Sequence, residues 1–259
     1  MGHFHPDDVV EEALRLLRAG VRPGDVAART GVPRNTVWRW RKVYLHEGLP
    51  RGQSHCQVPC PRCDGAALDE DAYAELLGWY LGDGHIVRAR RGVWKFSIYN
   101  DANYADDNAR LVETIGRLKP GSTPMALARR GMVTTYLYWK HWPCLFPQHG
   151  PGYKHTRPIV LDRWQREVVE RRPGPFLRGL FHSDGCRTNN WASRIVNGER
   201  KRYDYPRWQF SNRSDDIRDL CCWALDLLEI PWRQSNTWCI SVSRREAVAR
   251  LDALIGLKS

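Results

Sequence analysis

Two short apolar runs in this chain share one pattern. Leu76–Gly84 reads Leu-Leu-Gly-Trp-Tyr-Leu-Gly-Asp-Gly, and Leu177–Gly185 reads Leu-Arg-Gly-Leu-Phe-His-Ser-Asp-Gly. Each run predicts a helix with two small residues four positions apart, which lie on one helix face. Such a face lets two helices approach until their backbones touch. The small residues are Gly78 and Gly82 in the first run and Gly179 and Ser183 in the second.

The pattern after each run predicts two strands, a helix, two strands and a helix, so the order αββαββα occurs twice. In the first copy these elements are expected at Ile86–Arg90, Val93–Tyr99, Tyr104–Leu118, Met125–Arg130, Thr134–Lys140 and Ile159–Arg171. In the second copy they are expected at Cys186–Val196, Tyr205–Ser211, Asp215–Glu229, Trp232–Ser235, Trp238–Val242 and Arg245–Ile255.

This repeat predicts an α+β fold made of two pseudo-symmetric half-domains. Asp83 and Asp184, which end the two runs, are about one hundred residues apart, and each half therefore has about that length. The half-domains are expected at 71–172 and 173–259, related by a pseudo-two-fold axis between the two motif helices. A Trp-x-Phe-Ser sequence recurs in the second strand of each half, beginning at Trp94 and at Trp208.

The N-terminal residues 1–45 predict a separate module of three helices. The helices are expected at Asp7–Ala19, Pro23–Thr30 and Pro33–Leu45, because glycines lie where helices should end and prolines lie where they should begin. The last two helices are typical of a helix-turn-helix.

The third helix of this module would present polar side chains to DNA, with Val37 and Trp40 anchored in the small core. The residues expected to contact DNA are Arg34, Asn35, Thr36, Arg39 and Lys42. A three-helix bundle that contacts another protein is the alternative, but the density of arginine favours DNA.

The charge of the chain supports a polyanionic partner. Of 259 residues, 40 are Lys or Arg and 29 are Asp or Glu, which gives a formal net charge of +11 at pH 7. This excess indicates nucleic acid rather than an acidic small molecule. No apolar run reaches the ~18–20 residues of a membrane span, and Met1–Glu12 lacks the apolar stretch of a signal peptide. We therefore expect a cytoplasmic, nucleoid-associated protein with no membrane partner.

Basic and amide side chains alternate with apolar ones along the predicted strands. Strands with one face on a core and the other on a phosphate-lined groove have this pattern, although a solvated face explains some of these charges. The candidates for DNA contact are Arg88, Arg90, Lys95, Arg129, Arg207, Gln209 and Arg233. An insertion in the second half adds Arg200, Lys201 and Arg202, which are expected to reach along DNA.

The linker expected at 46–70 contains part of a zinc site. Cys60-Pro-Arg-Cys63 has the spacing of a zinc knuckle, and Cys56 or His55 could add ligands. The alternatives are a fourth ligand from elsewhere in the chain and a loop of free thiols without zinc. The other cysteines lie among apolar neighbours, as buried free thiols do. They are Cys144, Cys186, Cys221, Cys222 and Cys239.

Both apolar runs end in Asp-Gly. Asp83 and Asp184 would lie in the last helical turns, with Gly84 and Gly185 in left-handed caps. If the helices pair side by side, the two carboxylates meet and need a cation, which helix C-termini also favour. A single helix of this kind would be an ordinary core element, but two copies favour a divalent metal site. Backbone carbonyl groups of Gly82 and Ser183 could supply further metal ligands.

These two runs resemble the motif helices of the LAGLIDADG homing endonucleases. The resemblance covers roughly residues 70–259 and rests on both copies of the motif. It implies saddle-shaped antiparallel sheets, a monomer, and cleavage of both strands of double-stranded DNA with Mg²⁺ or Mn²⁺ held by Asp83 and Asp184. It also implies a basic residue late in each half that reaches the bound water or phosphate. Lys154 and Lys258 occupy comparable places.

A transcription regulator that uses the same scaffold only to bind DNA is the alternative hypothesis. Some LAGLIDADG-like regulators with helix-turn-helix domains have lost the acids, so the presence of both Asp83 and Asp184 favours the enzyme. The N-terminal module is compatible with either function. His182, inside the second motif helix, is expected to be a packed histidine rather than a metal ligand.

Overall fold

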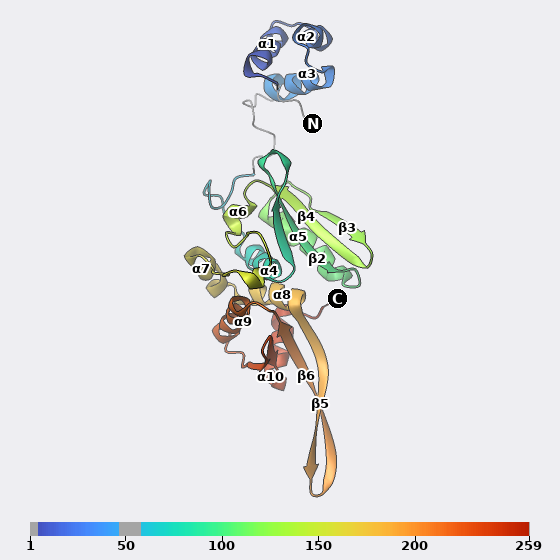
Figure 1. Ribbon diagram of the computed structural model, residues 1–259, viewed down its shortest axis with the longest axis vertical. Coiled ribbons are helices and arrows are strands. Elements are labelled where there is room, and N and C mark those ends of the chain that lie inside the picture. The colour runs from blue at the N-terminus through green and yellow to red at the C-terminus, as the bar shows by residue number, and fades with distance from the viewer. Residues whose placement is uncertain (1–4, 47–57, 259) are drawn as a thin grey trace. The chain divides into compact units, whose positions relative to one another are not determined.

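The computed structural model describes residues 5–46 and 58–258 (Figure 1). The chain divides into two compact units, Met1–Val58 and Pro59–Ser259. The boundary falls inside the expected linker. Helices and two antiparallel sheets build the described residues, which confirms the α+β class. None of the described helices is both long enough and apolar enough to span a bilayer.

The N-terminal unit contains the three predicted helices. They are α1 (Asp7–Arg18), α2 (Pro23–Thr30) and α3 (Arg34–Trp40), followed by a π-helical turn, Arg41–His46. Gly31 ends α2 at φ 68°, in the left-handed region that suits glycine. The apolar faces of the helices form a small core of Val10, Ala13, Leu14, Leu16, Leu17, Val26, Val32 and Val37.

The first half of the second unit has the predicted order of elements. They are α4 (Glu70–Leu81), β1 (Gly84–Arg88), β2 (Trp94–Asp101), α5 (Ala105–Leu118), β3 (Met125–Arg129), β4 (Met132–Trp139) and α7 (Arg163–Arg171). A short helix, α6 (Trp142–Leu145), and two 3₁₀ turns, Arg90–Gly92 and Lys154–Thr156, lie between them. The strands form one antiparallel sheet in the order β1-β2-β4-β3. α7 begins after its expected start because Asp162 forms a capping box with Gln165.

The second half repeats this order. Its elements are α8 (Pro173–Asp184), β5 (Gly185–Val196), β6 (Glu199–Ser211), α9 (Asp215–Leu227), β7 (Arg233–Asn236), β8 (Cys239–Val242) and α10 (Arg245–Ile255). The strands form an antiparallel sheet in the order β5-β6-β8-β7, which is the order of the first sheet. The two pseudo-symmetric αββαββα halves are therefore confirmed.

The hairpin of β5 and β6 is longer than predicted. β6 begins at Glu199 rather than at Tyr205, so the basic insertion is part of a continuous strand. Asn197 and Gly198 connect the two strands with φ values of 53° and 80°, as a type I′ turn requires. In Figure 1 this hairpin extends well beyond the helices of its half.

The Trp-x-Phe-Ser sequences of the two halves are offset by two residues relative to the first strand of each sheet. Gly84 pairs with Ile98 in the first sheet, whereas Gly185 pairs with Phe210 in the second. Phe96 and Phe210 therefore do not occupy equivalent places. Because side chains alternate along a strand, the offset keeps both on the core face, and both phenylalanines are fully buried.

α4 and α8 pack with their backbones in contact. A Cβ atom on Gly78 would lie 2.3 Å from the carbonyl oxygen of Phe176 and 2.9 Å from the Cα atom of Gly179. A Cβ atom on Gly179 would lie 2.1 Å from the carbonyl oxygen of Glu75. No side chain fits at either position without moving a helix, so the structure has the interface that the small residues predict.

Gly84 and Gly185 do not form the left-handed caps expected from the sequence. Gly185 has φ −97° and ψ 157°, and each glycine is the first residue of a strand. Glycine is required there for close approach to the preceding helix. A Cβ atom on Gly84 would lie 2.3 Å from the Cα atom of Tyr80, and one on Gly185 would lie 2.4 Å from the carbonyl oxygen of Phe181.

Replacing Gly78 with alanine should destabilise the second unit. The added methyl group would force α4 and α8 apart, and overpacking of this kind costs ~1–3 kcal/mol or more. The midpoint of thermal unfolding should therefore fall by at least ~2–4 °C. Calorimetry on the whole chain measures this change.

The matched control is Gly116→Ala in α5. A Cβ atom on Gly116 would meet its nearest neighbour at 3.7 Å, an ordinary contact, and alanine favours a helix. This variant should unfold at the wild-type temperature or above it. If Gly78→Ala also unfolded at the wild-type temperature, the two backbones would not be in contact.

Candidate functional site

The two motif aspartates come together where α4 and α8 end. Asp184 is the last residue of α8, whereas Asp83 lies just past α4, which ends at Leu81 rather than at the aspartate as expected. A Cβ atom on Gly82 would lie 2.0 Å from the hydroxyl oxygen of Ser183 and 3.1 Å from Oδ2 of Asp184. The carboxylate of one helix therefore reaches the end of the other.

Both carboxyl groups lie where their negative charge is disfavoured. Burial, followed by the charge of Asp184, raises the pKa of Asp83 to about 6. Burial also raises the pKa of Asp184, although Nδ2 of Asn212 donates a hydrogen bond of 2.6 Å to its Oδ2. Lys154 and Lys258 oppose both shifts. The pair is therefore a binding place for positive charge.

The structure brings both predicted lysines to these aspartates. Nζ of Lys154 donates hydrogen bonds to the carbonyl oxygens of Tyr80, of Gly82 at 2.6 Å and of Gly84 at 2.9 Å. At the equivalent place in the second half, Nζ of Lys258 donates to the carbonyl oxygens of Ser183 at 3.2 Å and of Gly185 at 3.1 Å. Each ammonium group therefore binds the end of one motif helix.

These hydrogen bonds engage the backbone carbonyl groups that the sequence suggested as metal ligands. The carbonyl oxygens of Gly82 and Ser183 each accept a hydrogen bond from a lysine, so a positive charge already lies against each of them. Burial lowers the pKa of Lys154 to about 8, while Asp184 and Asp83 act to raise it. Two ammonium groups and two carboxylates thus nearly balance in charge at this site.

A concave pocket opens beside Asp83. Its volume is about 430 Å³, and its lining includes His85, Tyr153, Lys154 and Arg157. Tyr153 is 74% exposed, and Lys154 is the first residue of the 3₁₀ turn that follows it. The pocket therefore offers basic and aromatic side chains next to the paired carboxylates.

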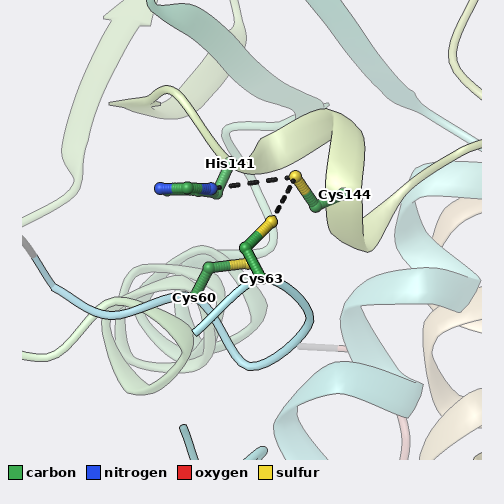
Figure 2. Close-up of side chains that lie close together, drawn as sticks. All are labelled: Cys60, Cys63, His141 and Cys144. Atoms are coloured by element: carbon green, nitrogen blue, oxygen red, sulfur yellow. Dashed lines mark hydrogen bonds between the residues drawn. The ribbon is translucent and has the colours of Figure 1, made fainter. Parts of the chain in front are cut away.

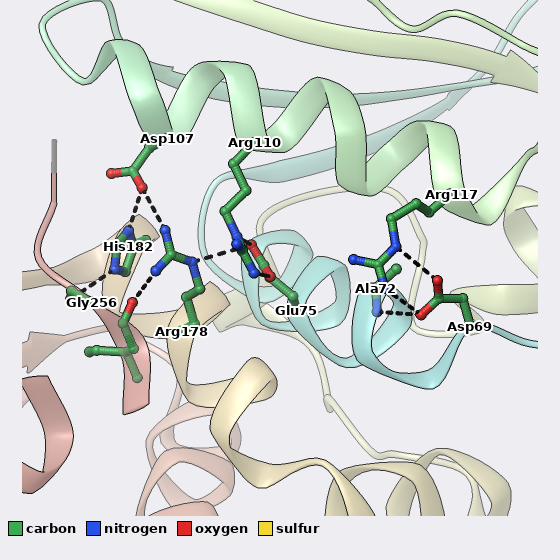
Figure 3. Close-up of polar contacts among 10 residues, drawn as sticks. Asp69, Ala72, Glu75, Asp107, Arg110, Arg117, Arg178, His182 and Gly256 are labelled. Carbon is green, nitrogen blue, oxygen red and sulfur yellow. Dashed lines mark hydrogen bonds and ion pairs between the residues drawn. The ribbon is translucent and has the colours of Figure 1, made fainter. Parts of the chain in front are cut away.

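A buried set of charged side chains holds the C-terminal segment that carries Lys258 (Figure 3). On α8, Arg178 donates to the carbonyl oxygen of Ile255, and Nε2 of His182 lies 3.4 Å from that of Gly256. Nδ1 of His182 lies 2.7 Å from Oδ1 of Asp107 on α5. His182 is fully buried, as expected from the sequence.

Sequence reasoning missed Arg178 and Asp107, although a signal for Arg178 was present. An arginine inside an apolar helix needs a buried partner. Arg178 finds two carboxylates, because its guanidinium lies 3.1 Å from Asp107 and 3.4 Å from Glu75. Glu75 in turn pairs with Arg110 of α5 at 2.6 Å.

The predicted DNA-contacting residues of the N-terminal unit lie mostly on its surface. Arg34, Asn35 and Arg39 on α3 and Lys42 in the π-helical turn are exposed, and Thr36 is partly buried. The predicted anchors face the core, with Val37 fully buried and Trp40 packed against the apolar cluster. Trp38, which the sequence did not single out, is 48% exposed with the guanidinium of Arg41 5.5 Å from its ring centre.

The predicted residues on the two sheets divide into an exposed set and an enclosed set. The exposed set is Arg88, Arg90, Arg129, Arg200, Lys201, Arg202 and Arg233. Lys95 and Gln209 are partly buried, and Nζ of Lys95 lies 4.1 Å from the ring centre of Tyr136. Arg207 is buried, because its Nε donates a hydrogen bond of 2.6 Å to Ser241 on β8. The expectation that Arg207 faces DNA is not met in this conformation.

The structure describes two of the four predicted zinc ligands. Cys60 and Cys63 are described, whereas His55 and Cys56 lie outside the described residues. The two described thiols meet His141 and Cys144 in space, as Figure 2 shows. Cys144 is a free thiol, as expected, but it is only partly buried, and its sulfur lies 3.3 Å from that of Cys63.

Comparisons with known proteins find matches to part of this architecture. Residues 11–51 match the family model of a homeodomain-like domain. No curated protein matches the chain. Among solved structures, the chain is similar to the homing endonuclease I-DmoI in complex with DNA and Mn, with 12% identity over 73% of this chain and 98% of that chain and a TM-score of 0.47.

Two further solved structures are similar at comparable levels. The LAGLIDADG meganuclease I-AabMI bound to uncleaved DNA has 10% identity over 70% of this chain and 82% of that chain, with a TM-score of 0.44. Full-length DUF199/WhiA from Thermatoga maritima has 16% identity over 74% of this chain and 58% of that chain, with a TM-score of 0.45. Identities this low concern the fold and not the activity.

The raised pKa of Asp83 predicts a pH-dependent effect of Asp83→Asn. The folded pKa of about 6 exceeds the unfolded value of 3.8, so ionisation of Asp83 destabilises the folded state. This cost is absent below about pH 4 and complete above about pH 6. In chelator, the variant should be more stable than wild type at pH 7 by at most about 3 kcal/mol, and this gain should vanish near pH 4.

Thermal unfolding at the two pH values measures this difference. Asp106→Asn is the control, because Asp106 is an exposed aspartate on α5 and its replacement changes the net charge equally. A gain in stability of Asp83→Asn that does not depend on pH would contradict the buried-carboxylate account.

Proposed function

We propose that this protein is a metal-dependent endonuclease that cuts both strands of double-stranded DNA at a specific site. The observation that carries the proposal is the junction of α4 and α8, where Asp83, Asp184, Lys154 and Lys258 act on one another electrostatically. Phosphodiester hydrolysis requires neutralised phosphate charge, an activated water and a stabilised leaving oxygen. Paired carboxylates and ammonium groups suit these requirements.

The donor atoms at this junction fit a hard divalent cation. They are carboxylate oxygens in a site where burial disfavours their charge, and such oxygens suit Mg²⁺ or Mn²⁺. Asp83 and Asp184 would hold the ion. When bound, it would lower the pKa of a water and stabilise the leaving oxygen. The carbonyl groups of Gly82 and Ser183 already accept hydrogen bonds from the lysines, whose positive charge opposes a metal ion at those two oxygens.

The two lysines would place positive charge beside the reacting phosphates. Each lies at the end of a different motif helix, so one lysine serves each half of the site. With a pKa of about 8, Lys154 is mostly protonated at pH 7 but gives up its proton more readily than an exposed lysine. It can therefore bind a phosphate oxygen or exchange a proton with a nearby water.

The arrangement of the halves suits a duplex whose two strands run in opposite directions. One chain supplies both aspartates and both lysines, so a monomer suffices. The exposed basic residues of the two sheets and of the β5–β6 hairpin would contact the DNA backbone, which supplies most of the affinity. The helix-turn-helix of the N-terminal unit would lengthen the footprint.

A DNA-binding regulator that does not cleave is the second candidate. One observation favours it: the ammonium groups of Lys154 and Lys258 already occupy the carbonyl oxygens of Gly82 and Ser183. The carboxylate pair is thereby largely neutralised without a metal ion. A scaffold of this kind could be stable and bind DNA without performing any chemistry.

Cleavage of a randomised duplex library in Mg²⁺ separates the two candidates. We expect metal-dependent cutting at an enriched sequence. Asp83→Asn and Asp184→Asn should each lower the rate at least about 100-fold, as the loss of one transition-state contact does. DNA affinity should stay nearly unchanged, because phosphate contacts are spread over many basic residues.

Asp106→Asn again provides the control and should cut at the wild-type rate. If both single variants, Asp83→Asn and Asp184→Asn, cut DNA at the wild-type rate, the assignment of the site is refuted. Tight, specific binding by the wild type without any cutting would establish the regulator instead.

The N-terminal unit makes a separate prediction about salt dependence. If Arg34 and Arg39 each contact a phosphate, replacing both with glutamine should make the negative slope of log affinity against log salt less steep by about 1.8, at ~0.9 for each contact. The control replaces Arg15 and Arg18, two exposed arginines of α1, with glutamine. Equal slopes for both double variants would show that α3 does not lie on DNA.

A further inference from the structure

Two pairs of potential metal ligands, far apart in the sequence, meet in the first half-domain. Cys60 and Cys63 enclose two residues near the start of the second unit, and His141 and Cys144 enclose two residues at the start of α6. One ligand atom from each of the four lies within 4.8 Å of the others. Figure 2 shows the four side chains converging from the two segments.

Each pair lies in a tight turn that its own hydrogen bonds hold. The amide of Cys60 donates to Oδ2 of Asp64 at 2.7 Å, and the amide of Asp64 donates to the carbonyl oxygen of Cys60 at 2.8 Å. The amide of Cys144 donates to the carbonyl oxygen of His141 at 3.0 Å. The turns therefore fix the spacing of the ligands within each pair.

The two distances across the cluster are within about 0.5 Å of those around a tetrahedral zinc ion. Zn–S bonds of about 2.3 Å and Zn–N bonds of about 2.0–2.1 Å place two sulfurs about 3.8 Å apart, and a sulfur and a nitrogen about 3.6 Å apart. The sulfurs of Cys63 and Cys144 are 3.3 Å apart, and Sγ of Cys144 lies 3.7 Å from Nδ1 of His141. A disulfide would need about 2.05 Å and would leave one thiol and the imidazole without a role.

We propose that Cys60, Cys63, His141 and Cys144 bind a structural zinc ion. Three thiolates and one imidazole form a closed Cys₃His set, which selects Zn²⁺ over Mg²⁺ or Ca²⁺ and leaves no open position for a substrate. This site lies outside the junction of Asp83 and Asp184 and does not depend on DNA cleavage. Three of these ligands come from turns rather than from regular helix or strand.

The ion would attach the first residues of the second unit to α6. On its other side, α6 is already fixed to the motif helix α4, because the hydroxyl group of Tyr73 donates a hydrogen bond of 2.6 Å to the carbonyl oxygen of Leu145. Arg62, between the two cysteines, lies with its guanidinium 4.4 Å from the ring centre of Trp164 on α7. The zinc ion would therefore set where the chain enters the half-domain.

Elemental analysis of the whole protein, purified without added metal or chelator, tests the site. We expect one zinc per chain. Cys63→Ser and Cys144→Ser should lose the zinc on dialysis against a chelator that leaves the wild type loaded. Cys186→Ser, which replaces an exposed thiol outside the cluster, should retain it, as should the double variant Asp83→Asn and Asp184→Asn.

Replacement of the ion by Co²⁺ provides a second measurement, and its result for the wild type does not depend on any variant folding. Wild type and Cys186→Ser should show the strong visible absorption of tetrahedral cobalt bound to thiolates, and Cys144→Ser should not. Absence of both zinc and the cobalt spectrum in the wild type would overturn the proposal. Zinc that persists in Cys63→Ser and Cys144→Ser, or a disulfide between these two cysteines under anaerobic purification, would also overturn it.

Discussion

The contact between Gly78 and Gly179 is the constraint on which the second unit depends. It allows α4 and α8 to pack backbone against backbone, and it thereby brings the ends of both helices to one place. Glycine within a helix costs roughly 0.5–1 kcal/mol relative to alanine. The burial of almost every residue of α4 offsets that cost, since all residues from Ala72 to Leu81 are buried. The position of Asp83 next to Asp184 follows from this packing.

Charge near the helix pair is arranged in two layers. At the helix ends, Lys154 and Lys258 face the two aspartates, and further back Arg178 links α8 to α5 and to the C-terminal segment. The layers are not symmetric. Asn212 holds Asp184, whereas Asn100, at the equivalent place in the first sheet, binds Asn108 instead. The two halves of the site therefore share a plan but differ in how firmly each carboxylate is fixed.

Features set by local pattern could be predicted from the sequence, and features set by tertiary contact could not. The motif helices and the αββαββα order follow from the repeated sequence pattern, whereas Lys154 and Lys258 were expected near the motif acids because of the resemblance to the LAGLIDADG family. The partners of Cys60 and Cys63 could not be found, because His141 and Cys144 are brought to them only by folding. Arg207 was misjudged because its acceptor, Ser241, lies on another strand. Gly84 and Gly185 were correctly recognised as special, but the reason is close packing rather than a left-handed backbone.

Locating a bound Mn²⁺ ion by its anomalous scattering, in crystals of the protein grown without chelator, tests the central claim most directly. The account predicts a peak that both Asp83 and Asp184 contact through carboxylate oxygens, and predicts its loss in the double asparagine variant. The ammonium groups of Lys154 and Lys258 should lie near this ion, each at the end of a different motif helix. A structure in which the two carboxylates point apart, or in which Mn²⁺ binds elsewhere and leaves this junction to the lysines alone, would contradict it.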